Sequence, residues 1–219
     1  MSASTTLKLN PDKTVGYHLV AGIIGRLATL LFRPTVTGEE NIPLTGPVLI
    51  TPIHRSNLDF AFTLFMSPRK VFFMAKDSIF RVPVLGRLLL NLGAFPVTRG
   101  TADRESMKLA EEVLRLGHAL VLFPEGTRQE GRVVGQLRDG AMFVAARTGA
   151  TVIPVGVGSR DRTRIAGVRV PWPARLRIVV GAPIVAPSAQ GRISRSIITA
   201  KSEELRQALQ QVYLESLDA

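Results

Sequence analysis

Short apolar runs alternate with longer segments of helical periodicity along most of this chain, which limits the folds open to it. Strands are predicted at 36–37, 48–51, 71–74, 94–97, 119–123, 152–156 and 176–181. Helices are predicted over 103–116 and 195–213, where apolar residues recur at helical spacing. In the first helix, charged residues are expected to face solvent and apolar residues the core: Glu105, Lys108, Glu112 and Arg115 against Met107, Ala110 and Leu114. Alternating strands and helices indicate one α/β domain over residues 36–219.

Length and composition narrow the class of protein further. At 219 residues the chain suits one domain with a core of its own. It contains no cysteine, which excludes disulfides, a cysteine nucleophile and thiolate metal ligands. The three histidines, His18, His54 and His118, are scattered among apolar stretches. We therefore predict no metal site and no bound cofactor.

The net charge of +11, from 28 Lys and Arg against 17 Asp and Glu, implies an anionic partner. Nucleic acid and the surface of an anionic bilayer both fit this charge. The chain has one Trp and two Tyr, no recognisable basic recognition helix and no aromatic stacking platform, so we predict a lipid membrane surface and no nucleic acid. The densest basic stretch, 160–177, holds six Arg and one acidic residue, and its alternative interpretation is a solvated loop.

The N-terminal segment indicates how the protein would contact a membrane. Residues 1–14 are polar and lack the basic region and cleavage site of a signal peptide. Residues 15–32 are apolar apart from His18 and Arg26, and on a helical wheel their apolar side chains share one broad face. Because Arg26 would be costly inside a bilayer, we predict an amphipathic interfacial helix within residues 1–35, and a peripheral or monotopic protein on the cytoplasmic face. The alternative is a helix that docks on the protein's own core.

His54 and Asp59 are the strongest candidates for chemistry. A neutral imidazole accepts a proton, and a neighbouring carboxylate fixes its tautomer and stabilises the imidazolium. Five residues apart in a regular helix, the two side chains would lie about 140° apart around the axis, so they can meet only across a turn. Ser56 and Asn57 are good N-cap residues, which places His54 in a loop and Asp59 in the first helical turn. The pair predicts proton abstraction from a hydroxyl; the alternative is a loop histidine beside a capping aspartate.

Five sequence blocks occur in an order that resembles a known family. They are His54–Asp59, Ala75–Gly86, Gly93–Arg99, Phe123–Arg128 and Val152–Val157. They are similar to the motifs of the glycerolipid acyltransferases, the 1-acylglycerol-3-phosphate acyltransferases and their relatives. The resemblance covers roughly residues 40 to 185. It implies the glycerolphosphate acyltransferase fold, with a mixed, mostly parallel β-sheet flanked by helices.

The resemblance also implies an activity. A fatty acyl group would pass from acyl-CoA or acyl carrier protein to a hydroxyl of a glycerol phosphate acceptor, foremost 1-acylglycerol-3-phosphate, giving phosphatidic acid. His54 with Asp59 would be the general base, and the acyl thioester a co-substrate. Alternatives are acylation of glycerol 3-phosphate or another lysolipid, and a non-catalytic membrane-lipid-binding protein. A serine hydrolase is disfavoured because the chain has no Gly-x-Ser-x-Gly elbow.

Roles for further residues follow from the same resemblance. The acceptor phosphate would be bound by three cations, Lys76, Arg99 and Arg128, each of which is alternatively a surface charge. The acceptor-binding turn would consist of Glu125, Gly126 and Thr127. The alternative for Glu125 is a structural pair with Arg128, and Gly126 is expected where the backbone needs a positive φ or a close approach. Residues 82–92 are a candidate wall of an acyl groove, and backbone N–H groups near Val155 and Gly156 are candidate oxyanion donors.

Overall fold

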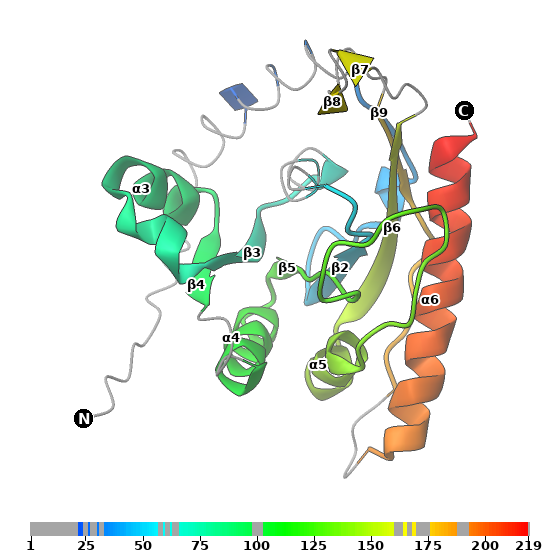
Figure 1. Ribbon diagram of the computed structural model, residues 1–219. Coiled ribbons are helices and arrows are strands. Elements are labelled where there is room, and N and C mark those ends of the chain that lie inside the picture. The colour runs from blue at the N-terminus through cyan, green and yellow to red at the C-terminus, as the bar shows by residue number, and fades with distance from the viewer. Residues whose placement is uncertain are drawn as a thin grey trace.

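The structure is a computed structural model, and its ribbon is shown in Figure 1. It describes residues 22, 23, 26, 30, 33–56, 59, 62, 66–97, 103–159, 164–165, 168–169, 176–187 and 193–218. Most of the predicted N-terminal helix, most of the basic stretch 160–177, and Arg99 therefore lie outside the described residues.

A mixed, mostly parallel sheet forms the centre of the molecule and confirms the predicted fold class. Its strands are β1 (Thr35–Thr37), β2 (Val48–Pro52), β3 (Val71–Lys76), β4 (Ala94–Val97), β5 (Ala119–Val121), β6 (Thr151–Ser159) and β9 (Leu176–Val180). Their order is β1-β9-β6-β2-β5-β3-β4. Strands β2 to β6 run parallel to one another, whereas β9 is antiparallel to β6 and β1 pairs parallel with β9. Every predicted strand is present, with ends that differ by a few residues.

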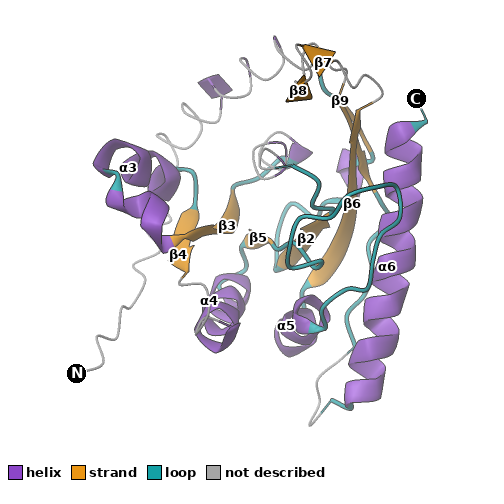
Figure 2. Cartoon of the chain, in the orientation of Figure 1, coloured by secondary structure: helices purple, strands orange, loops and turns teal. Residues whose placement is uncertain are grey.

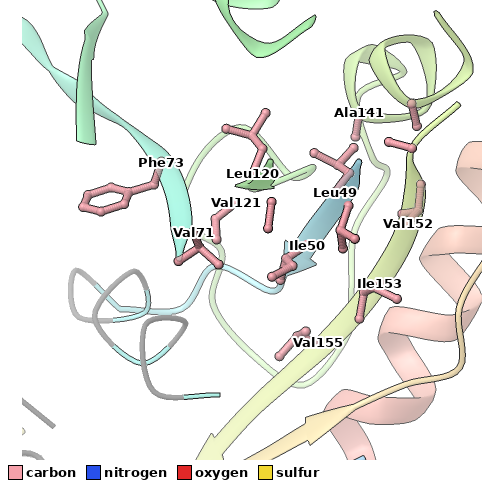
Figure 3. Close-up of a cluster of buried hydrophobic side chains, with 14 of the residues drawn as sticks. Leu49, Ile50, Val71, Phe73, Leu120, Val121, Ala141, Val152, Ile153 and Val155 are labelled. Carbon is pink, nitrogen blue, oxygen red and sulfur yellow. The ribbon is translucent and has the colours of Figure 1, made fainter. Parts of the chain in front are cut away.

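Strand β2 lies between β6 and β5, with Val48 opposite both Thr151 and Ala119. All of its residues are buried, as expected for a parallel strand that is covered on both faces. Its apolar side chains form the middle of the core together with those of β5, β3 and β6 (Figure 3). A separate short hairpin of β7 (Arg164–Ile165) and β8 (Val168–Arg169) was not predicted.

Three helices lie side by side along one face of the sheet (Figures 1 and 2). They are α4 (Asp103–Arg115), which packs on β5, α5 (Gly140–Thr148), which packs on β2 and β6, and α6 (Arg195–Leu217), which packs on β6 and β9. The predicted faces of α4 are confirmed, since Ala110 and Leu114 are fully buried and Glu105 and Lys108 are exposed. Helix α5 was not predicted.

The other end of the sheet is covered differently. After β3 the chain forms the 3-10 helix η2 (Asp77–Arg81) and then α3 (Pro83–Asn91), which packs on β4 and η2. A second 3-10 helix, η1 (Glu39–Asn41), follows β1. Within α3 only Gly86 and Leu89 are buried, so most of its apolar side chains remain accessible. Figure 1 shows α3 at the far end of the molecule from α6.

The N-terminal residues that the structure does describe are helical. They are Gly22, Ile23, Arg26 and Leu30, and all are exposed. The rest of the predicted amphipathic helix lies outside the described residues. Among the described residues, no helix has the length and apolar content needed to cross a membrane.

Candidate active site

The sequence blocks meet where neighbouring parallel strands end. His54 lies two residues after the end of β2, Phe123 lies two residues after the end of β5, and Lys76 is the last residue of β3. Because these strands are parallel neighbours in the sheet, their carboxyl ends share one edge. The strand order therefore brings the first and third blocks together, although about seventy residues separate them in the chain.

His54 and Asp59 are in contact across the predicted turn. The His54 Nδ1 atom lies 3.1 Å from Asp59 Oδ2, and Asp59 is 2% exposed. The same Oδ2 accepts hydrogen bonds from the backbone N–H groups of Arg55 (2.6 Å) and Ser56 (2.7 Å). The carboxylate thus satisfies the backbone of the loop and fixes the imidazole at once. With the hydrogen on Nδ1, Nε2 carries the lone pair that a general base requires.

The imidazole ring is also held on its face. It stacks on the Phe123 ring, with a centroid separation of 4.3 Å and an interplanar angle of 30°. The His54 side chain remains 22% exposed, and within the described part of the chain its Nε2 atom makes no hydrogen bond. A base that is fixed on one nitrogen and accessible on the other suits proton transfer to or from a bound molecule.

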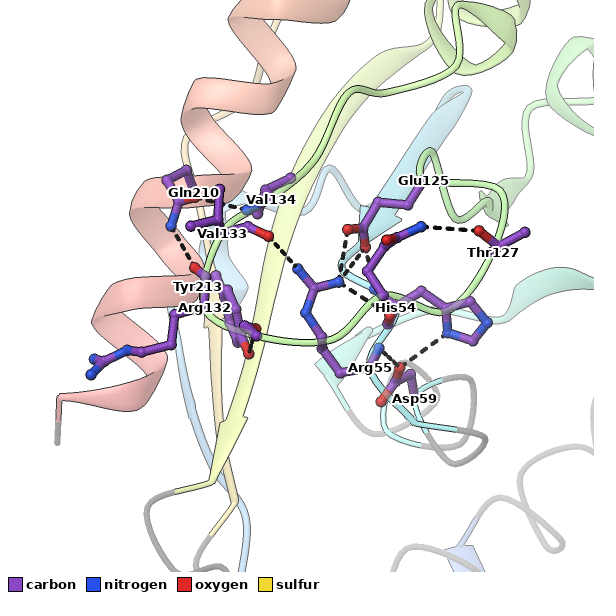
Figure 4. A network of polar contacts seen from close by, with 12 residues as sticks. His54, Arg55, Asp59, Glu125, Thr127, Arg132, Val133, Val134, Gln210 and Tyr213 are labelled. Atoms are coloured by element: carbon purple, nitrogen blue, oxygen red, sulfur yellow. Dashed lines mark hydrogen bonds and ion pairs between the residues drawn. The ribbon is translucent and has the colours of Figure 1, made fainter.

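Glu125 is buried, and its carboxylate faces the loop that carries His54 (Figure 4). Its Oε2 accepts a hydrogen bond of 2.7 Å from the backbone N–H of His54. Arg55 Nη1 lies 2.7 Å from Oε1 and 2.9 Å from Oε2, and the Arg55 and Glu125 side chains are 13% and 1% exposed. The structural partner of Glu125 is therefore Arg55, not Arg128 as the alternative interpretation had it. Its role in acceptor binding stays a prediction.

Arg55 and Tyr213 are residues that the sequence analysis missed. Arg55 Nη2 donates to the carbonyl of Val133 at 3.2 Å, and its guanidinium carbon lies 5.0 Å from the centre of the Tyr213 ring. Arg55 sits inside the first block, so its position beside His54 was the available signal. Tyr213 belongs to α6, far along the chain, and nothing in the sequence pattern connects it with the site.

The turn after Phe123 has the backbone that its glycine predicted. Gly126 has a φ of +73°, and its N–H donates to the carbonyl of Phe123 at 3.1 Å. The positive φ accounts for the glycine, because the Arg138 side chain, which an added Cβ would meet at 2.4 Å, is exposed and can move away. Thr127 is exposed, and its hydroxyl accepts a hydrogen bond from the Gln129 side chain.

The described cations proposed for the phosphate are free of ion pairs. Lys76 and Arg128 are both exposed, and neither forms an ion pair with any described residue. Arg138 is a further exposed cation at the same turn, and the sequence analysis did not single it out. Within the described ranges, no group of three His, Asp or Glu side chains is arranged to hold a metal ion.

The residues of the fourth block have places in the fold. Val155 is fully buried in β6, and its carbonyl accepts a hydrogen bond from the Ile53 N–H. Gly156 lies against α6, because an added Cβ would be 2.2 Å from the carbonyl oxygen of Val212. The close approach of α6 explains the glycine. The role of this backbone as an oxyanion donor stays a prediction.

The fold and the His–Asp pair define an α/β domain with a candidate general base at the carboxyl edge of its sheet. A family model described as Acyltransferase matches residues 33–158, more than half of the chain. The chain belongs to this acyltransferase family. The matched range includes His54, Asp59 and the third block, but neither β9 nor α6.

Several relatives are named 1-acyl-sn-glycerol-3-phosphate acyltransferases. The chain is 29% identical over 153 residues to a chloroplastic 1-acyl-sn-glycerol-3-phosphate acyltransferase of Arabidopsis thaliana, covering 68% of this chain and 43% of that protein. It is 24% identical over 198 residues to the 1-acyl-sn-glycerol-3-phosphate acyltransferase of Bacillus subtilis, covering 90% of this chain and 96% of that protein. The chain spans less than half the length of the plant and algal relatives, with coverages of 43%, 41% and 49%.

A solved structure has the same fold. The crystal structure of the 1-acyl-sn-glycerophosphate acyltransferase PlsC from Thermotoga maritima superposes with a TM-score of 0.71 at 21% sequence identity. The match covers 94% of this chain and 83% of that chain. At this identity the likeness extends to the fold and confirms the predicted architecture.

Proposed function

We propose that the protein transfers a fatty acyl group from an acyl thioester to the free hydroxyl of 1-acylglycerol-3-phosphate, producing phosphatidic acid. The observation that carries the proposal is the His54–Asp59 contact at the carboxyl edge of the sheet, within a chain of the acyltransferase family. The relatives named above as 1-acyl-sn-glycerol-3-phosphate acyltransferases support this choice of acceptor.

The proposed chemistry uses the accessible nitrogen of His54. Nε2 takes the proton of the acceptor hydroxyl while Asp59 holds Nδ1 and stabilises the imidazolium. The acceptor oxygen attacks the thioester carbonyl, and the tetrahedral intermediate collapses with loss of the thiolate, to which the imidazolium returns the proton. The acyl group passes directly between substrates, with acyl-CoA or acyl carrier protein as co-substrate and no other cofactor.

The acceptor phosphate is proposed to bind to exposed cations at the same edge of the sheet. Lys76 and Arg128 are at this edge and have no carboxylate partner among the described side chains. Arg99, which follows β4 in the sequence, is proposed as the third ligand. A guanidinium binds phosphate through two parallel hydrogen bonds and an ammonium as a point charge, so together these cations suit a phosphomonoester.

We further propose that the protein meets an anionic membrane, on the cytoplasmic face, through the open side of η2 and α3. Exposed apolar side chains gather here, with Val82 52%, Val84 82% and Leu90 55% exposed. Two exposed arginines, Arg81 and Arg87, lie on the same short stretch. Apolar side chains beside cations complement an anionic lipid surface, which takes up the first and attracts the second.

The position of this surface supports a lipid bilayer as its occupant. Helix η2 begins directly after Lys76, the last residue of β3. The exposed apolar side chains of 82–90 therefore come shortly after the end of a strand whose carboxyl end lies at the same edge of the sheet as His54. An acceptor with an acyl chain would then present its headgroup at the site while its chain stays in the lipid. The prediction that residues 82–92 form the wall of an acyl groove is compatible with the same contact.

A direct assay tests the activity. Purified protein would be incubated with labelled acyl-CoA, or separately with acyl carrier protein, and with 1-acylglycerol-3-phosphate, glycerol 3-phosphate or a lysophospholipid without a phosphomonoester. We expect phosphatidic acid as the main product, identified by mass spectrometry. Faster acylation of glycerol 3-phosphate would reassign the acceptor. Vesicle binding without any acyl transfer would replace the enzyme with a lipid-binding protein.

A further inference from the structure

We propose that Arg55, Glu125 and Tyr213 act as positioning residues that hold the His54 loop in its working geometry. This inference rests on the proposed function and changes the role of Glu125. The resemblance assigns Glu125 to the acceptor, whereas its contacts in the structure direct it to the backbone of the base (Figure 4).

The first step concerns the carboxylate of Glu125. Both oxygens accept from Arg55 Nη1, and Oε2 also accepts from the His54 N–H. At 1% exposure, the side chain presents no open surface to a hydroxyl or a phosphate. A charge-assisted hydrogen bond of 2.7 Å to the His54 N–H is strong and directional, so it fixes the backbone from which the imidazole projects.

The second step concerns Arg55, which connects the two carboxylates around His54. Its backbone N–H donates to Asp59 and its side chain donates to Glu125. Asp59 therefore holds the ring of His54, Glu125 holds its main chain, and Arg55 contacts both. We call these three contacts, from Arg55 to Asp59, from Arg55 to Glu125, and from Glu125 to His54, the histidine clamp.

The third step brings in α6. The Tyr213 ring lies under the Arg55 guanidinium, and its hydroxyl donates to the Gly131 carbonyl at 3.1 Å. One turn earlier, the Gln210 side chain accepts from the Val134 N–H and donates to the Arg132 carbonyl. Helix α6 thus holds the loop that supplies the Val133 carbonyl to Arg55.

A gap in the hydrogen bonding of Arg55 points the same way. Its Nε is buried and has no hydrogen-bond partner, alone among the buried side-chain nitrogens and oxygens of the described residues. The aromatic face of Tyr213 offers this cation a favourable contact in place of an acceptor. Arg55 thus keeps its position between Glu125 and Tyr213 although its Nε has no acceptor, which supports a positioning role.

The kinetic test separates positioning from acceptor binding. In Glu125→Gln and Arg55→Gln we expect kcat to fall about ten- to a hundredfold, because a displacement of about 1 Å at a catalytic group has costs of this order. The KM for 1-acylglycerol-3-phosphate should stay close to wild type. Glu130→Gln, at an exposed side chain of the adjoining loop, and Arg195→Gln, at the exposed start of α6, make the same chemical changes away from these contacts and should leave both constants unchanged. A raised acceptor KM with unchanged kcat would show that Glu125 binds the acceptor and would overturn the clamp.

Two further variants test the arrangement itself. Because Arg55 and Glu125 act as one pair, the double variant should lose no more kcat than the more impaired single variant. If the two residues had independent roles, the fold-losses in kcat of the single variants would multiply in the double variant. Tyr213→Phe keeps the ring and should retain more kcat than Tyr213→Leu, which removes it. Multiplicative losses in the double variant would contradict the clamp. Equal kcat in the two Tyr213 variants would contradict a positioning role for the Tyr213 ring.

A last measurement needs no enzymatic activity. Carbethoxylation of His54 by diethyl pyrocarbonate can be followed by peptide mass spectrometry, with His118 as an internal reference. We expect His54 to react faster in Arg55→Gln and Glu125→Gln, while His118 is unaffected. Unchanged His54 reactivity in both variants would overturn the clamp. Absence of acyl transfer by the wild-type protein would overturn the proposed function but not the clamp.

Discussion

Three residues contact His54 from different directions. Asp59 contacts its Nδ1, Phe123 its ring face, and Glu125 its backbone N–H. Asp59 is helical and lies five residues after His54, whereas the other two residues follow β5. A base fixed in this way needs little reorganisation when a substrate hydroxyl arrives, which is the main condition for efficient proton transfer.

Removal of the base should abolish the activity while leaving the fold intact. We expect His54→Ala to lower the rate of acyl transfer about 10²- to 10⁴-fold, the usual contribution of a general base. Asp59→Asn should cost less, because the imidazole remains. Initial rates with saturating substrates measure the loss, and thermal unfolding with vesicle binding confirms that the variant is folded. Wild-type turnover by His54→Ala would end the proposed mechanism.

The exposed cations should affect the acceptor and not the thioester. We expect Lys76→Ala and Arg128→Ala each to raise the acceptor KM roughly ten- to a hundredfold, since a charge-assisted hydrogen bond contributes about 1.5 to 3 kcal/mol. Lys108→Ala, on the exposed face of α4, is the matched control and should change nothing. If the acyl-CoA KM rose instead, these cations would be reassigned to the phosphates of the donor.

At the scale of single residues, the sequence was informative about the contact between His54 and Asp59 and less so about the residues that support it. The His54–Asp59 spacing predicted a contact across a turn, and the turn is present. The glycine at 126 predicted a positive φ, which is also present. The partner of Glu125 was not predictable, because Arg55 reaches it from the loop after β2, a strand that only the sheet order places beside β5.

Among the elements, the contact between β6 and α6 is unusually close. Gly156 and Gly158 lie opposite the carbonyl groups of Val212 and Ser216, and a Cβ at either position would be within 2.6 Å of backbone or side-chain atoms of α6. Small residues here allow the helix to settle onto the strand. The position of Tyr213 under Arg55 therefore depends on glycines in another element.

This contact predicts a large effect from one methyl group. We expect Gly156→Ala to lower the free energy of unfolding by about 1 to 3 kcal/mol, the usual range for overpacking a tight interface, because the obstructing atoms are backbone. Gly135→Ala, where a Cβ would meet nothing within 4 Å, is the control. Urea denaturation of both variants measures the difference. Equal stability of the two would show that α6 shifts without cost.

The elements that the sequence failed to predict share a physical cause. Helix α5 buries Ala141, Met142, Val144, Ala145 and Ala146, so it has little contrast between faces for a periodicity argument to detect. Helix α3 is nine residues long and Arg87 is its one charged residue, so few positions in its sequence mark a solvent face. Helix α4, with charges on one face and apolar residues on the other, was predicted almost to the residue.

Across the whole molecule, charge and exposed apolar surface fit the proposed contact with a membrane in one orientation. The net charge of +11 would attract the protein to anionic lipid, and the exposed residues of α3 follow the edge of the sheet that carries His54. In the proposed orientation, a lipid acceptor would not have to leave the bilayer before it reacts. The topology, not the sequence order, brings these features together.

Charge inserted into the apolar side of α3 should weaken membrane binding. We expect Val84→Asp to reduce binding to anionic vesicles and to lower turnover of long-chain acceptors more than that of short-chain soluble ones. Val185→Asp is the matched control, since Val185 is 77% exposed and Val84 82%, and it lies after β9. Sedimentation with vesicles at increasing salt measures both the binding and its electrostatic share. Equal binding by the two variants would move the contact elsewhere, for instance to residues 1–32 or 160–177.

The contact between Tyr213 and Arg55 has a consequence for hybrid proteins. The range matched by the family model ends at residue 158, whereas a side chain that touches the histidine loop belongs to α6. A crossover at residue 158 would combine the His54 loop of one parent protein with the Tyr213 helix of another. Exchanges between relatives should therefore transfer the loop 129–134 and α6 together, and inheritance of the two as a unit is what a comparison of many natural sequences should reveal.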